Sequence, residues 1–304
     1  MLLAAHLITY FQAIVIGALQ GITELFPISS LGHAVILPKL LGWHLNQKEH
    51  YFLAFLVATH LATAIVLFIF FFREWIRILR GLGRSLRERQ IRADDADARL
   101  AWLLVVGTIP AGLLGLLFEH PLRSLFANPK AAAAFLAVNG ILLFVFEAVR
   151  RRAPGAPERA DELARLPETP TDEDAEKRLA TLGWKEAVGV GTAQAAALFP
   201  GISRSGVTMG GSLFVGLTHE DAARYAFLLA TPIIAAAALL KLPDLFGHDG
   251  DGVRGQALVG ALVAGVCAWF SVRFLMRYFE TNRLTPFAAY CLVAGVVSLI
   301  VFIV

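Results

Sequence analysis

Long apolar runs almost free of charged residues recur along the chain. A helix needs about 17–25 predominantly apolar residues to cross a bilayer, and six runs reach that length directly or with their flanks. They are Tyr51–Phe72, Leu100–Phe118, Ala131–Val149, Ala222–Leu240, Ala257–Val272 and Leu284–Val304. Because a soluble helical core rarely contains more than one or two such runs, the pattern predicts an all-α integral membrane protein with six full transmembrane helices.

Four further apolar pieces are too short to cross. Residues 6–22 and 34–42 flank one polar segment, and Ala187–Phe199 and Val207–Leu217 flank another. Irregular backbone at membrane depth is tolerated only where it is buried in protein or lines a cavity. The sequence therefore predicts four re-entrant half-helices that meet at two motif loops, residues 20–33 and residues 200–208.

Arginines set the orientation. Eight of them lie between Arg73 and Arg99, and three more, at positions 150–152, follow the third span. Loops rich in Lys and Arg stay on the cytoplasmic side of a membrane. Both segments are therefore predicted to be cytoplasmic. Residues 43–50, the mouth of the first motif loop and the C-terminus are predicted to lie outside.

The two halves of the chain repeat each other. Leu25–Ser29 (LFPIS) corresponds to Leu198–Ser203 (LFPGIS), and Phe55–Thr59 (FLVAT) corresponds to Phe227–Thr231 (FLLAT). The predicted orientations of matching spans are opposite, which is the signature of an inverted-topology repeat. We expect a first membrane repeat over 1–150, a cytoplasmic polar loop over 151–186 and a second, inverted repeat over 187–304.

The composition agrees with this picture. Hydrophobic residues make up 57% of the chain and charged residues only 17%, whereas soluble domains carry about 25% charged residues. The two cysteines, Cys267 and Cys291, lie inside apolar spans and are predicted to pack there. The net charge of +3 is small, and we expect a lipid bilayer, not nucleic acid, as the surrounding partner.

The first motif loop carries an unusual set of polar groups for a membrane segment. It contains a carboxylate (Glu24), two hydroxyls (Ser29 and Ser30) and an imidazole (His33) within ten residues. Ionisable groups at membrane depth are energetically costly and usually functional. We expect His33 to act as base, acid or nucleophile. His60 lies within a span. It could line a cavity, but its position favours a role in packing.

The second motif loop carries the complementary charge. Arg204 offers a planar fork of donors, and a half-helix beginning near Ser205 would point its positive end into the same space. Ser203 and Thr208 add hydroxyls, and Gly206 lets the backbone approach a ligand closely. Together these features predict an oxyanion site, with phosphate the leading candidate. At membrane depth Arg204 needs a partner, either Glu24 or the anionic ligand.

The two motifs, Gln20-Gly-x-Thr-Glu-x-x-Pro-x-Ser-Ser-x-Gly-His33 and Pro200-Gly-x-Ser-Arg-Ser-Gly-x-Thr208, resemble the signatures of the undecaprenyl-diphosphate phosphatase family of the bacitracin-resistance type. The resemblance covers essentially the whole chain. It implies hydrolysis of undecaprenyl diphosphate to undecaprenyl phosphate and phosphate at a bacterial inner membrane, which recycles the lipid carrier for peptidoglycan synthesis. The orientation given by the arginines would open the site to the periplasmic or extracellular face.

The resemblance also implies site residues. The catalytic positions are Glu24, Ser30, His33 and Arg204. The diphosphate-binding positions are Gln20, Ser29, Ser203, Arg204, Ser205, Gly206 and Thr208. Glu24 would hold a divalent cation, Mg²⁺ or Ca²⁺, or orient the base. Two positions depart from the family pattern: Gln20 replaces a common Glu, which removes a second carboxylate ligand, and Leu31 replaces a common Thr.

Several alternatives stay open at this point. A transporter or flippase of a phosphorylated polyprenyl lipid would share the inverted repeats and the charges near the midplane. Glu24 together with His33 favours the phosphatase, because binding alone does not require them. Ser30 and His33 compete for the role of nucleophile or base. The prenyl length and the oligomeric state, a homodimer included, are also undecided.

Overall fold

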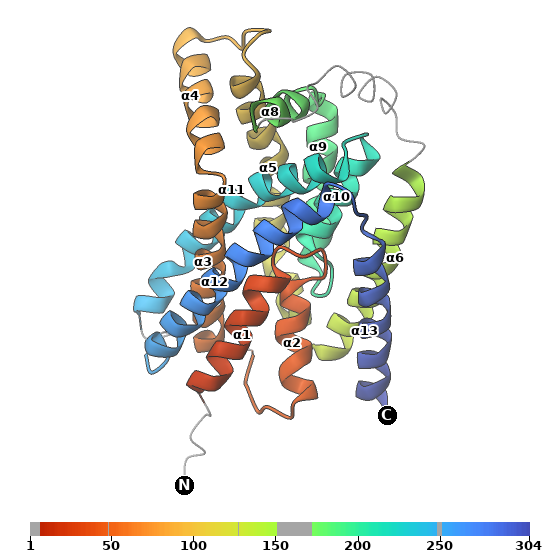
Figure 1. The fold of residues 1–304 in the computed structure, drawn as a ribbon. Coiled ribbons are helices and arrows are strands. Elements are labelled where there is room, and N and C mark those ends of the chain that lie inside the picture. The colour runs from red at the N-terminus through yellow and green to blue at the C-terminus, as the bar shows by residue number, and fades with distance from the viewer. Residues whose placement is uncertain (1–6, 48, 127, 151–171, 248–250) are drawn as a thin grey trace.

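The computed structural model describes residues 7–47, 49–126, 128–150, 172–247 and 251–304 (Figure 1). These residues form helices and no strand. The helices are α1 (Tyr10–Thr23), α2 (Ser30–Leu40), α3 (His50–Phe70), α4 (Phe72–Glu88), α5 (Ala96–Phe126), α6 (Pro129–Val149), α8 (Asp172–Ala180), α9 (Trp184–Ala193), the 3₁₀ helix η2 (Gln194–Leu198), α10 (Arg204–Phe214), α11 (His219–Phe246), α12 (Arg254–Phe279) and α13 (Thr285–Ile303).

The prediction of six long apolar helices is confirmed among the described residues. Each has the length and hydropathy of a membrane span: His50–Phe70, Ala96–Phe118, Pro129–Val149, His219–Pro243, Arg254–Phe279 and Thr285–Ile303. Their outward faces remain apolar and exposed, for example Leu116, Leu240 and Phe270. Large exposed apolar faces on every long helix are what a lipid environment requires. The chain is therefore a multi-pass membrane protein.

The polar motifs coincide with the starts of two short helices. Ser29 caps α2 by accepting a hydrogen bond from the N–H of Gly32 at 3.2 Å, and Ser203 caps α10 by accepting one from the N–H of Gly206 at 3.1 Å. A capping hydroxyl satisfies one of the donors that a helix start leaves without a partner. Both short helices thus begin at the motif loops, with their positive ends directed toward the loops.

Glycines bring the short and long helices close together in the same way in both halves. Gly17 of α1 lies so near Gly260 of α12 that a Cβ there would overlap the Gly260 carbonyl. Gly191 of α9 lies equally close to Gly107 of α5. The pair α6 and α13 also packs tightly, because Gly140 and Gly295 each lie against the backbone of the other helix.

The arginine-rich segment after the first span is helical rather than a loop. Helix α4 continues from α3 and pairs with the start of α5 (Figure 1), where Arg84 bonds Asp95 at 2.8 and 2.9 Å. These bonds hold the pKa of the Asp95 carboxyl below its usual range. Within the predicted polar loop 151–186, residues 151–171 lie outside the described part, while α8 is helical and docks through Arg77 and Glu176 at 2.6 Å.

Candidate active site

The two motif loops meet in the interior and are held together by a side chain from α6. The amide nitrogen of Asn139 donates to the carbonyl of Pro27 at 3.0 Å, and its amide oxygen accepts from the N–H of Ser203 at 3.0 Å. Ser205 Oγ adds a hydrogen bond to the carbonyl of Phe26 at 3.0 Å. Asn139 is completely buried. One amide therefore satisfies a backbone group of each loop and fixes their spacing.

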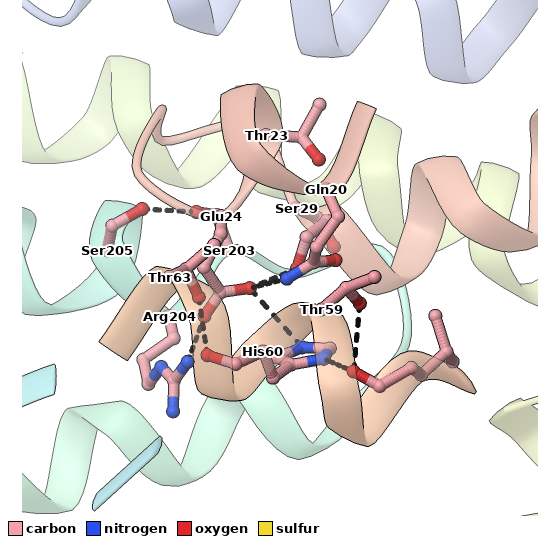
Figure 2. A network of polar contacts seen from close by, with 12 residues as sticks. Gln20, Thr23, Glu24, Ser29, Thr59, His60, Thr63, Ser203, Arg204 and Ser205 are labelled. Carbon is pink, nitrogen blue, oxygen red and sulfur yellow. Dashed lines mark hydrogen bonds and ion pairs between the residues drawn. The ribbon is translucent and has the colours of Figure 1, made fainter. Parts of the chain in front are cut away.

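Glu24 lies at the centre of the polar network where the loops meet (Figure 2). One carboxylate oxygen forms an ion pair with the Arg204 guanidinium. The other accepts hydrogen bonds from Ser30 Oγ at 2.5 Å and from the amide of Gln20 at 3.0 Å. The predicted partnership of Glu24 and Arg204, 180 positions apart, is thus present in the structure.

The network faces an apolar cavity of about 650 Å³. Glu24, Ser30 and Arg204 line its floor, and Leu56, Leu198 and Ile234 are among its apolar walls. His50, at the start of α3, and Lys241, near the end of α11, also line it. Both of these helix ends are predicted to lie on the outer side of the membrane. A largely apolar cavity with a few convergent polar groups is the usual form of a small-molecule site.

His60 belongs to this site, although its place inside a span favoured a packing role. Its Nδ1 donates to the carbonyl of Leu56 at 2.8 Å, and its Nε2 lies 3.4 Å from the carboxylate of Glu24 (Figure 2). With Nδ1 donating, Nε2 can donate to Glu24 only when the ring carries both protons. The motifs gave no signal for His60. An imidazole in an otherwise apolar span, matched by Pro232 in the other repeat, was the one available clue.

His33 does not line the cavity, and its described contacts do not include Glu24. Its Nδ1 donates to the carbonyl of Ser29 at 2.7 Å, and its Nε2 lies 2.8 Å from the hydroxyl of Tyr290 on α13. The ring also stacks on Tyr290 with an interplanar angle of 10°. Both ring nitrogens therefore have partners, the Ser29 carbonyl and the Tyr290 hydroxyl, and neither partner is a carboxylate. The structure brings together three of the four predicted catalytic residues, Glu24, Ser30 and Arg204, but not His33.

The predicted diphosphate ligands divide into two groups. Ser29, Ser203 and Arg204 line the cavity. Among the described contacts, Gln20 bonds Glu24, Ser205 bonds the first loop, and Thr208 Oγ1 donates to the carbonyl of Arg204 at 2.7 Å. A Cβ added at Gly206 would lie only 3.3 Å from Pro27, so the glycine allows the two loops to pack closely. These four are placed to support the site, and they do not line its cavity.

The donor set for a divalent cation is small. Among the described residues, no group of three or more His, Cys, Asp and Glu side chains is close enough to hold a metal ion. Within the part of the chain that the structure describes, Glu24 is the one carboxylate that lines the cavity. The amide oxygen of Gln20 is buried without a hydrogen-bond partner, so it is an orphaned acceptor. One carboxylate and one amide oxygen fit a Mg²⁺ site only where substrate phosphates complete the coordination.

Comparison with known proteins identifies the family. Residues 13–297 match the family described as bacitracin resistance protein BacA. An undecaprenyl-diphosphatase of Mycolicibacterium paratuberculosis is 52% identical, with 98% of each chain covered. Undecaprenyl-diphosphatase 1 of Frankia casuarinae is 46% identical, covering 97% of this chain and 98% of the relative. Undecaprenyl-diphosphatase 2 of Chromobacterium violaceum is 42% identical, covering 95% and 97%. With matches of this length and identity, the chain belongs to the BacA family of bacitracin resistance proteins.

Proposed function

We propose that this chain is an undecaprenyl-diphosphatase, which hydrolyses undecaprenyl diphosphate to undecaprenyl phosphate and inorganic phosphate. The observation that carries the proposal is the joining of Ser30, Glu24 and Arg204 across two loops at the floor of an apolar cavity. The names of the full-length relatives agree with it. The product is the lipid carrier in its reusable form, which serves peptidoglycan synthesis.

Ser30 is the proposed nucleophile and Glu24 its base. The Ser30 hydroxyl attacks the terminal phosphorus, and its proton passes to the Glu24 carboxylate that it already bonds at 2.5 Å. The bridging P–O bond breaks with its electrons going to undecaprenyl phosphate. Water then attacks the phosphorus of the phosphoserine and the Ser30 Oγ–P bond breaks. The protonated Glu24 returns its proton to Ser30 Oγ, and the oxygen and hydrogens of the water leave with the phosphate. Trapping a labelled phosphoenzyme and mapping it to Ser30, rather than to His33, tests this assignment.

Charge neutralisation is the larger part of catalysis in phosphoryl transfer. Arg204 supplies a guanidinium beside the base, and the N-terminal ends of α2 and α10 direct their backbone N–H groups and positive dipoles at the same place. When the diphosphate binds, its oxygens would compete with Glu24 for Arg204. That exchange frees Glu24 to act as a base only when substrate is present.

The decisive experiment is phosphate release from undecaprenyl diphosphate by the purified protein in detergent. Removing one donor to the developing charge typically lowers kcat by about 10²–10³-fold, so Arg204→Ala and Glu24→Ala should each lose at least that much. If the wild-type protein moves the lipid between leaflets in vesicles but releases no phosphate, the flippase alternative holds and the enzyme assignment is wrong.

The arrangement in the membrane is also part of the proposal. We infer two inverted repeats whose half-helices, α1–α2 and α9–α10, enter from opposite faces, with residues 1–150 and 187–304 as the repeats. The matching glycine contacts of α1 with α12 and of α9 with α5 support this symmetry. The site would open to the periplasmic or extracellular side of the inner membrane.

An impermeant thiol reagent tests the orientation. Asn46→Cys, in the segment before α3, should be labelled in intact cells, whereas Lys177→Cys on α8 should be labelled only after lysis. The native Cys267 and Cys291 lie within α12 and α13, and a variant with both changed to Ala provides the background. Labelling of position 177 but not 46 in intact cells would invert the topology.

A divalent cation, Mg²⁺ or Ca²⁺, stays a prediction. Glu24 is the residue that would hold it, together with the diphosphate. Bound there, it would neutralise phosphate charge. Full activity after exhaustive chelation would remove the cation from the proposal. A homodimer also stays a prediction.

A further inference from the structure

The catalytic cavity is too small for the whole of the proposed substrate. A volume of about 650 Å³ is of the size that encloses a drug-sized ligand. An undecaprenyl chain has eleven isoprene units in addition to the diphosphate. With the diphosphate at the cavity floor, most of that chain has to leave the cavity and lie elsewhere on the protein or in lipid.

A second apolar cavity, the α4–α5 groove, lies on the neighbouring faces of the same helices. It has a volume of about 500 Å³, and its lining includes Trp75 and Leu79 of α4, Val105, Ile109 and Gly112 of α5, and Pro232 of α11. The one hydroxyl in its lining, Thr108 Oγ1, donates to the carbonyl of Leu104 at 2.7 Å. The indole nitrogen of Trp75, the other polar side-chain atom in the lining, is buried and has no hydrogen-bond partner among the described residues. The surface that the groove presents to a ligand is therefore almost wholly apolar, which suits a hydrocarbon.

The two cavities adjoin along α5 and α11. Ala111 lines the catalytic cavity and Gly112 the groove, while Ile233 lines the catalytic cavity and Pro232 the groove. Consecutive residues of a helix point about 100° apart, so the two cavities lie on adjacent faces of α5 and of α11. The side chains at this boundary are small on α5. A Cβ added at Gly112 would meet no atom within 4 Å, so there is open space on the groove side.

One end of the groove lies at the same level in the membrane as Glu24. His60, beside Glu24, stands near the middle of α3. Pro232 occupies the matching position in α11 of the other repeat. From that level the groove extends along α5 toward Ala101 and along α4 toward Leu82, away from His50 and Lys241 at the other end of the catalytic cavity. The hydrocarbon and the released phosphate would thus leave the reacting centre in different directions.

We propose that the α4–α5 groove binds the prenyl chain of the substrate after it passes between α5 and α11. This inference rests on the proposed phosphatase function and adds a chain-length-sensing subsite to it. In a membrane the competing solvent is lipid, as apolar as the chain itself, so selectivity comes from packing rather than from the hydrophobic effect. The expected consequence is discrimination between long and short prenyl diphosphates.

Filling the groove tests the proposal. Gly112→Leu places a side chain in the open space, and Ile109→Ala, at a half-exposed position, removes one from the groove wall. The kcat/KM of each variant is measured with undecaprenyl diphosphate and with farnesyl diphosphate, whose three prenyl units are too few to extend far beyond the catalytic cavity. Gly189→Leu on α9, an exposed position where an added Cβ also meets nothing within 4 Å, is the matched control.

The expected result is selective. Gly112→Leu lowers kcat/KM for undecaprenyl diphosphate about tenfold, the usual effect of one misfitted group in an apolar pocket, and leaves that for farnesyl diphosphate within about twofold. Ile109→Ala shows the same selectivity with a smaller loss, and Gly189→Leu changes neither. An equal loss of kcat/KM with both substrates, or no loss with either, overturns the proposal. The groove would then be filled by membrane lipid. A wild-type protein that hydrolyses neither substrate overturns the phosphatase function itself.

Discussion

Two buried ion pairs of this protein have the same chemistry and opposite surroundings. Arg178 of α8 bonds Asp221 of α11 through three contacts of 2.8–3.0 Å, and the two side chains are only 8% and 2% exposed. Arg204 pairs with Glu24, but its side chain is 25% exposed because it faces the catalytic cavity. The first pair joins two helices. In the second pair, the phosphate of a substrate can replace Glu24 as the partner of Arg204.

The difference explains why only one of them is a site. A guanidinium whose contacts with a carboxylate are closed off from solvent cannot exchange that partner for a ligand without leaving a buried charge uncompensated. Arg204 can exchange Glu24 for phosphate, since both charges stay within reach of the cavity. The polar groups around Glu24, namely Ser30, Gln20 and His60, also exceed what an ion pair needs for stability.

Breaking the enclosed pair should produce the largest effect on folding. Asp221→Ala leaves Arg178 buried without its partner, and such a loss costs about 3–5 kcal/mol. We expect the free energy of unfolding in detergent micelles to fall by that amount. The protein that remains folded should keep its phosphatase activity per molecule. Replacing both partners, Arg178→Met with Asp221→Leu, should recover most of the stability. Equal loss in the single and double variants would contradict the argument.

Breaking the Arg204–Glu24 pair, which faces the cavity, should affect catalysis more than folding. Glu24→Gln keeps the shape of the side chain but removes its charge, so Ser30 loses its proton acceptor. We expect kcat to fall by about 10²–10³-fold, with a smaller fall in unfolding free energy than for Asp221→Ala, because the Arg204 side chain that loses its partner is 25% exposed to the cavity. Thermal unfolding and phosphate release on the same preparation separate the two effects. A large loss of stability with modest loss of kcat would make Glu24 structural.

Much of this arrangement was predictable from the sequence, and what was missed has a physical cause. Apolar length alone predicts the six spans, and the two motifs predict that the partner of Arg204 is either Glu24 or an anionic ligand. Periodicity within a span that is apolar all round does not show which side a residue faces. The sequence therefore predicts neither the position of His60, 3.4 Å from the Glu24 carboxylate, nor the hydrogen bonds of Asn139 to both motif loops. The orientation of His33 depends on Tyr290, 257 positions away.

Other misses were avoidable. The arginines of the segment after the first span recur at positions 73, 77, 80 and 84, three or four residues apart. Side chains at that spacing share one face of a helix. This spacing predicts the amphipathic helix α4 rather than a loop. The same segment supplies Trp75 and Leu79 to the α4–α5 groove, so its helical form matters for the proposed function as well as for topology.

The smallest effect is expected at His60, which lies beside the Glu24 carboxylate of the cavity-facing pair. His60→Ala removes one neighbour of the Glu24 carboxylate, but Arg204, Ser30 and Gln20 still hold it. A hydrogen bond to a charged group contributes about 1.5–3 kcal/mol, and with three donors left we expect only about a tenfold fall in kcat, with KM little changed. His60→Gln, which can still donate to Glu24, should recover most of it. His33→Gln serves as the comparison, since that ring contacts Tyr290 and not Glu24. His33→Gln could instead lower kcat far more than His60→Ala does. In that case His33, not His60, takes part in the reaction, and the site must rearrange around His33 when substrate binds.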